Sequence, residues 1–98
     1  MTSLTLFKQA CDTGASLSQY SNALQSLATD RRGSWTEAHD LLQDDHSRAG
    51  SWVHAYLHRK EGDAMNAAYW YRKAGEPVAT VSLDDEWEDI AAALLTQK

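Results

Sequence analysis

Apolar residues recur every three or four positions along most of the chain, which is the spacing of a helix that buries one face. The two clearest stripes consist of Leu17, Tyr20, Leu24, Leu27 and Ala28, and of Leu83, Trp87, Ile90, Ala91 and Leu94. The one β-prone stretch, residues 78–81, is short and follows Pro77, so we expect an extended linker there. The pattern therefore predicts an all-α protein.

Glycines and capping residues divide the chain into six predicted helices. Glycine favours the end of a helix, and Ser, Thr or Asp favours its start. Pairs of this kind occur at Gly14 and Ser16, Gly33 and Ser34, Gly50 and Ser51, and Gly62 and Asp63, while Ser82 precedes the last stripe. The predicted helices span 3–13, 16–31, 34–48, 51–61, 63–74 and 82–96.

A short internal repeat suggests how these helices are arranged. The tripeptide Gly-Ser-Trp occurs at residues 33–35 and 50–52, and the four tryptophans follow one another at intervals of 17, 18 and 17 residues. Two such units make a helical hairpin of about 34 residues, which is the period of tetratricopeptide arrays. We therefore expect about three antiparallel hairpins stacked in a single domain, residues 1–98.

Residues 47–77 resemble one repeat of the tetratricopeptide class. Ala67, Tyr71 and Ala74 share one helix face, and the string Trp-Tyr-Arg-Lys-Ala at 70–74 is particularly similar to Sel1-like repeats. The first helix of this repeat has His54 and Ala55 where the family usually has Leu and Gly. Residues 52–63 also resemble a family of small microbial proteins, a likeness that implies no activity. The repeat resemblance implies a helical stack with a binding surface.

Charge and composition narrow the function classes. The formal net charge of −5 argues against binding to nucleic acid or to an anionic membrane surface. No apolar run reaches the roughly 18 residues of a membrane span, and the N-terminus does not resemble a signal peptide. Cys11 is the only cysteine, so no intramolecular disulfide can form. These features favour a cytoplasmic protein.

Three histidines form a candidate metal site. His54 and His58 are four residues apart and therefore share a helix face. If the preceding helix runs antiparallel, His39 falls near their level, and Asp40 or Asp44 on that helix could add a carboxylate. Such a cluster would suit zinc or iron. Two histidines at this spacing often occur by chance. The alternative is therefore that these histidines are polar or interfacial residues that bind no metal.

Aromatic and cationic side chains form a candidate interaction face. Tyr69, Trp70 and Tyr71 spread over about 300° of a helix, so they cannot all enter one core. The predicted face consists of His54, His58, Tyr69, Trp70 and Arg72. The alternatives are that flanking helices cover the rings and that Arg72 is simply solvated. The acidic run at 84–89 is read as compensation of a helix dipole.

No complete catalytic motif, phosphate-binding loop or nucleophile elbow occurs in the sequence. The sequence therefore favours a protein-interaction or adaptor module, acting on a protein partner or by self-association, without a cofactor. The alternative is a metal- or small-ligand-binding protein, or an enzyme, that uses the histidine cluster.

Overall fold

The computed structural model describes residues 2–96 and contains six α-helices in that range. They are α1 (Ser3–Thr13), α2 (Asn22–Arg31), α3 (Trp35–Leu41), α4 (Arg48–Glu61), α5 (Ala64–Ala74) and α6 (Leu83–Leu95). No strand occurs among the described residues, so the all-α prediction is confirmed. Residues 78–81 lie in an irregular linker, as expected.

Each helix begins with the same kind of cap. The side chain of the preceding residue accepts a hydrogen bond from a backbone N–H in the first turn, and these residues are Thr2, Ser21, Ser34, Ser47, Asp63 and Ser82. This bond satisfies one of the N–H groups that have no partner within the helix. Ser34, Asp63 and Ser82 are the caps that the sequence predicts.

The predicted start of the second helix at residue 16 was wrong. The chain forms a turn there, in which Ser16 Oγ lies 3.2 Å from Ser18 Oγ, and the helix begins after Ser21. The guanidinium of Arg32 holds this loop by donating to the carbonyls of Ala10, Cys11 and Ala15. The apolar periodicity predicts that the helix extends through this segment, but the long-range contacts of Arg32 hold the segment as a loop.

The predicted boundary at Gly50 was also wrong. The third helix ends at Leu41 rather than near 48, and α4 begins at Arg48, so Gly50 lies inside α4. The Asp45 carboxyl group packs against this turn: a Cβ at position 50 would lie 2.5 Å from its carbon, so any larger residue would require the Asp45 side chain to move. The same carboxylate accepts from the backbone N–H of Ser47, the residue that caps α4.

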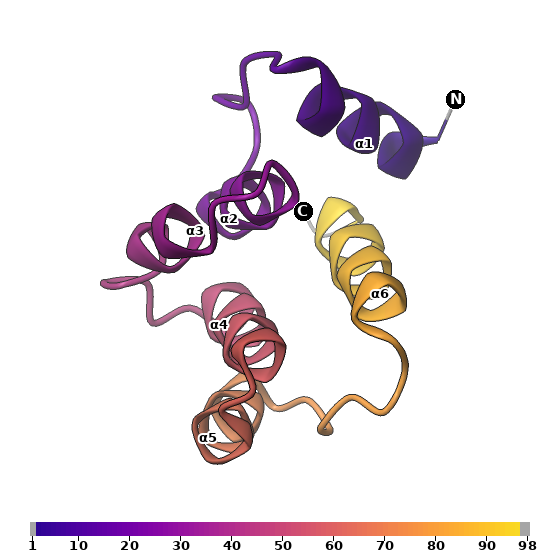
Figure 1. Ribbon diagram of the computed structural model, residues 1–98. Helices are drawn as coiled ribbons and strands as arrows, with labels where there is room; N and C mark the ends of the chain where they lie inside the picture. The colour runs from indigo at the N-terminus through magenta and orange to yellow at the C-terminus, as the bar shows by residue number, and fades with distance from the viewer. Residues whose placement is uncertain (1, 97–98) are drawn as a thin grey trace.

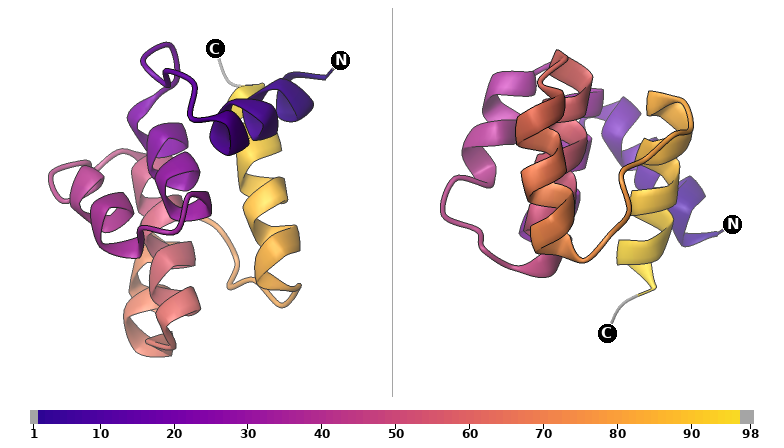
Figure 2. Two further views of the ribbon diagram at one scale, coloured as in Figure 1. Left: turned by 45° about the horizontal axis from the view of Figure 1, so that its top comes forward. Right: turned by 90° about the horizontal axis from the view of Figure 1, so that it is seen from below.

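Two pairs of consecutive helices pack closely together, α2 with α3 and α4 with α5. Ser26 in α2 donates to the carbonyl of Ala38 in α3, and Arg48 at the start of α4 donates to the carbonyl of Ala74 at the end of α5. The last helix then returns across the molecule, as Figures 1 and 2 show, and packs on α1, α2 and α4. A simple stack would place α6 against α5 instead, so the tetratricopeptide-like stack stays a prediction.

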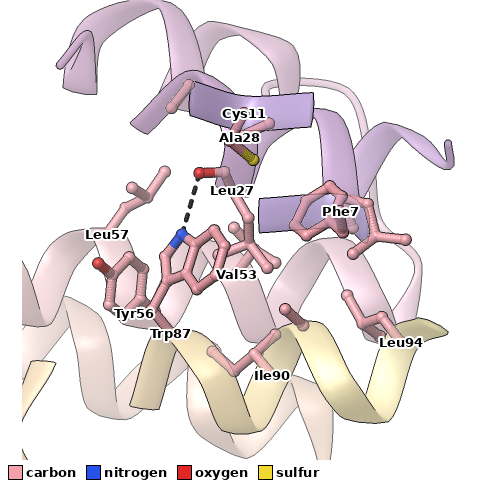
Figure 3. Packing of buried hydrophobic residues seen from close by; sticks show 14 of the residues in the cluster. Phe7, Cys11, Leu27, Ala28, Val53, Tyr56, Leu57, Trp87, Ile90 and Leu94 are labelled. Atoms are coloured by element: carbon pink, nitrogen blue, oxygen red, sulfur yellow. Dashed lines mark hydrogen bonds between the residues drawn. The ribbon is translucent and has the colours of Figure 1, made fainter. Parts of the chain in front are cut away.

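The main core lies where α6 meets the N-terminal helices (Figure 3). Trp87 stacks on Phe7 with ring centroids 5.6 Å apart, and its indole N–H donates to the carbonyl of Leu27 over 3.0 Å. The Arg31 guanidinium lies 5.0 Å from the centre of the Trp87 ring. Apolar side chains from α1, α2, α4 and α6 complete this cluster. Through it, α6 packs against both the N-terminal helices α1 and α2 and the central helix α4.

Two buried carboxylates link helices through tyrosine hydroxyls. Asp30 accepts from the hydroxyl of Tyr56 and from Lys60, while Glu86 accepts from the hydroxyl of Tyr71 and from Arg59. Burial raises the pKa of both tyrosines, and the neighbouring carboxylate raises each further. Each tyrosine therefore keeps its proton in the folded protein at a pH where it ionises in the unfolded chain.

This difference predicts a loss of stability in alkali. Above about pH 10 the unfolded chain releases two protons that the folded protein retains, so the free energy of unfolding falls as pH rises. We expect these two tyrosines to contribute a slope of about 2.7 kcal/mol per pH unit. Urea unfolding at a series of alkaline pH values measures this slope. Tyr56→Phe should remove half of the contribution, and an unchanged slope would contradict the assignment.

Candidate metal centre

Helices α3 and α4 bring the three predicted histidines together. The indole N–H of Trp35 donates to the carbonyl of Leu57 over 2.8 Å and fixes the two helices against each other. One turn along α3, His39 meets α4 at the level of His54. The order of these contacts shows that α3 and α4 run antiparallel, which is the arrangement that the predicted cluster required.

The imidazoles of His39, His54 and His58 converge on one point. Nε2 of His54 lies 3.0 Å from Nε2 of His39, and one ring nitrogen from each of the three residues lies within 4.8 Å of the others. Zinc–nitrogen bonds of 2.0–2.1 Å place two nitrogens of a tetrahedral site about 3.3 Å apart. Small side-chain rotations would therefore bring all three nitrogens onto a single ion.

Burial keeps the central histidine neutral. Only 4% of the surface of His54 is exposed, and the pKa of its imidazole is lowered to about 4, first by desolvation and then by His39 and His58. A histidine must be neutral to donate its lone pair to a metal. At neutral pH, His54 therefore needs to lose no proton in order to act as a ligand.

Glu61 orients the third imidazole. Its carboxylate lies 2.6 Å from Nδ1 of His58, a side chain that is itself buried. Because an ionised carboxylate can only accept, Nδ1 carries the proton in this pair, and in the neutral form of the ring Nε2 keeps its lone pair free. Carboxylate–histidine pairs of this kind fix the ring and raise its basicity in metal sites. Glu61 is thus a positioning residue for His58.

Nδ1 of His54 is buried and has no hydrogen-bond partner among the described residues, and the same is true of Ser51 Oγ one turn earlier in α4. Buried polar atoms normally find partners, so these two atoms are exceptions to the usual rule. In this arrangement the bond between the Nε2 atoms of His39 and His54 is the only one that holds the His54 imidazole within the described structure.

Two tryptophan rings pack against the histidine cluster. Trp70 stacks on His54 with a centroid separation of 3.9 Å, and Trp35 stacks on His39 at 5.0 Å. The Nζ atom of Lys73 lies 5.0 Å from the centre of the Trp70 ring. These rings reduce the access of water to the nitrogens, and lower local polarity strengthens the interactions of a bound ion.

The remaining predicted site residues lie elsewhere. Tyr69 is 48% exposed and Arg72 is exposed on the outer side of α5, whereas Trp70 is half-buried against His54. Asp40 and Asp44 are exposed and do not belong to the group of converging donors found among residues 2–96. The interaction face stays a prediction, although the burial of its two histidines leaves only α5 side chains for a partner to contact.

Sequence reasoning missed Glu61 and Trp35. Glu61 follows His58 by three residues, a spacing at which helix side chains meet, so that signal was present in the sequence. Trp35 gave no comparable signal, because its contact with Leu57 depends on how α3 crosses α4.

Comparisons with protein-family models, curated proteins and solved structures found no match for this chain. The repeat resemblance therefore stays a prediction. In the part of the chain that the structure describes, no helix combines the length and apolarity needed to cross a bilayer.

Proposed function

We propose that this protein binds one zinc ion through His39, His54 and His58. The observation that carries the proposal is the convergence of three imidazole nitrogens within 4.8 Å, contributed by two helices. Imidazole donors suit zinc, whereas non-haem iron sites commonly add a carboxylate ligand. Glu61 supports this choice because its carboxylate contacts the outer nitrogen of His58.

Calorimetric titration of zinc into the metal-free protein tests the proposal. We expect one ion per chain at neutral pH, and thermal stability that rises with zinc concentration. An ion present at one hundred times its dissociation constant adds about 2.7 kcal/mol to the free energy of unfolding. The absence of both a binding heat and a stability gain would refute the proposal.

A second candidate function, protein interaction, has a separate observation in its favour. Among the described residues, α5 packs closely on α4 alone, and its outer side exposes 87% of Met65 and 48% of Tyr69. Lys73 lies over the ring of Tyr69, so the stripe combines apolar, aromatic and cationic groups. Such side chains are common anchors of protein interfaces.

Sedimentation equilibrium distinguishes self-association through this stripe from binding to another protein. If two copies meet through α5, we expect a dimer that Tyr69→Ala dissociates. A monomer at all concentrations would exclude self-association. Binding to a different protein would then be the remaining form of the interaction hypothesis.

A further inference from the structure

The three histidines provide only part of the coordination shell that zinc prefers. Zinc in proteins is usually four-coordinate, and structural sites take all four ligands from the protein. Within residues 2–96, the group that converges with His39 and His54 contains His58 and no carboxylate or thiol. The one cysteine, Cys11, belongs to the core cluster of α1 and α6.

The carboxylate that contacts the cluster is placed to orient a histidine and not to bind the ion itself. Glu61 contacts Nδ1 of His58, on the opposite edge of the ring from the nitrogen that remains free to bind an ion. Asp63 joins Glu61 in a separate group with His58, and both acids are exposed. Neither acid can therefore complete a site between His39 and His54 while Glu61 holds His58.

The surroundings define which ligand could take the fourth position. Three neutral imidazoles leave the full positive charge on a zinc ion, and this charge favours water, hydroxide or a small anion. Of the three histidines, only His39 is half-exposed, so a ligand would reach the ion from its side. Trp35 and Trp70 stack on the rings of His39 and His54, so one face of each of these two rings is covered.

We infer that the zinc ion keeps one exchangeable position, occupied by water and open to small monodentate anions, on the side of His39. This inference rests on the proposed zinc site. Sites with three histidines and one exchangeable ligand are the type that activates water in zinc enzymes. The geometry thus points to a reactive rather than a purely structural metal centre.

Cobalt substitution with sodium azide as the probe tests the inference. Co²⁺ replaces zinc in tetrahedral sites and gives intense visible absorption bands that depend on the ligands. We expect Co²⁺ to bind once per chain, and azide to shift these bands until the change saturates. His46→Ala, which removes an exposed histidine outside the cluster, should show the same shift.

The outcomes separate the two claims. If Co²⁺ binds with tetrahedral bands that azide does not shift, the fourth ligand comes from the protein, which overturns the inference and leaves the proposed function in place. Dimerisation of the chain on Co²⁺ loading, measured by sedimentation velocity, would overturn it as well, because a second copy would then supply the ligand. If neither Co²⁺ nor Zn²⁺ binds, the proposed function and the inference both fail.

Discussion

His54→Ala is expected to abolish stoichiometric zinc binding and the thermal stabilisation that zinc provides. His54 is the central histidine of the cluster: its Nε2 lies 3.0 Å from that of His39, and its ring stacks on that of His58. Loss of an orienting outer residue usually lowers metal affinity ten- to a hundredfold. Removal of a ligand should cost more, so we expect the affinity to fall by at least about a hundredfold.

Two further variants give this experiment its controls. His46→Ala removes a histidine that is exposed and lies outside the cluster, so its zinc affinity should equal that of the unaltered protein. Glu61→Gln keeps the three ligands but loses the carboxylate that holds His58, so we expect an intermediate loss of about ten- to a hundredfold. Equal zinc affinity in His54→Ala and His46→Ala would show that the histidine cluster is not the metal site.

Trp87→Ala is expected to lower the free energy of unfolding by about 3–5 kcal/mol. The indole is buried, stacks on Phe7, and donates to the carbonyl of Leu27. Its removal leaves a cavity where α6 meets α1 and α2, and it also leaves that carbonyl without its side-chain donor. Domains have only about 5–15 kcal/mol of stability in total, so the variant should be close to unfolding at room temperature.

Urea denaturation followed by circular dichroism measures this loss. Trp87→Phe keeps an aromatic ring against Phe7 but loses the N–H donor, so its loss should be smaller. Tyr69→Ala removes an exposed aromatic residue from α5 and should change stability by no more than about 0.5 kcal/mol. If Trp87→Ala lost no more stability than Tyr69→Ala, α6 would not fasten the core as described.

Apolar periodicity predicts helices, and the glycine and capping signals divide the chain into six of them, the number that the structure contains within residues 2–96. The ends of the helices were less predictable where a distant side chain determines them. Asp45 packs on Gly50, and α4 runs through this glycine from its cap at Ser47. Arg32 holds the loop before α2. Neither contact can be predicted from the propensities of the neighbouring residues.

The candidate site could likewise be predicted only in part from the sequence. The spacing of His54 and His58, together with an antiparallel α3, predicts that His39 approaches them, and the structure places it there. The burial of the cluster could not be predicted, because it depends on Trp70 in α5 and on the crossing of α3 over α4. That burial is the main reason why the pKa of His54 is lowered, which keeps its imidazole neutral at neutral pH.

X-ray absorption at the zinc edge of the protein loaded with one equivalent of zinc tests the central claim most directly. We predict a four-coordinate ion with three imidazole nitrogens at 2.0–2.1 Å, the distance typical of zinc–histidine bonds. Multiple scattering from the imidazole rings identifies these ligands and counts them. A shell of oxygen ligands, or one imidazole or none, would contradict a zinc site formed by His39, His54 and His58.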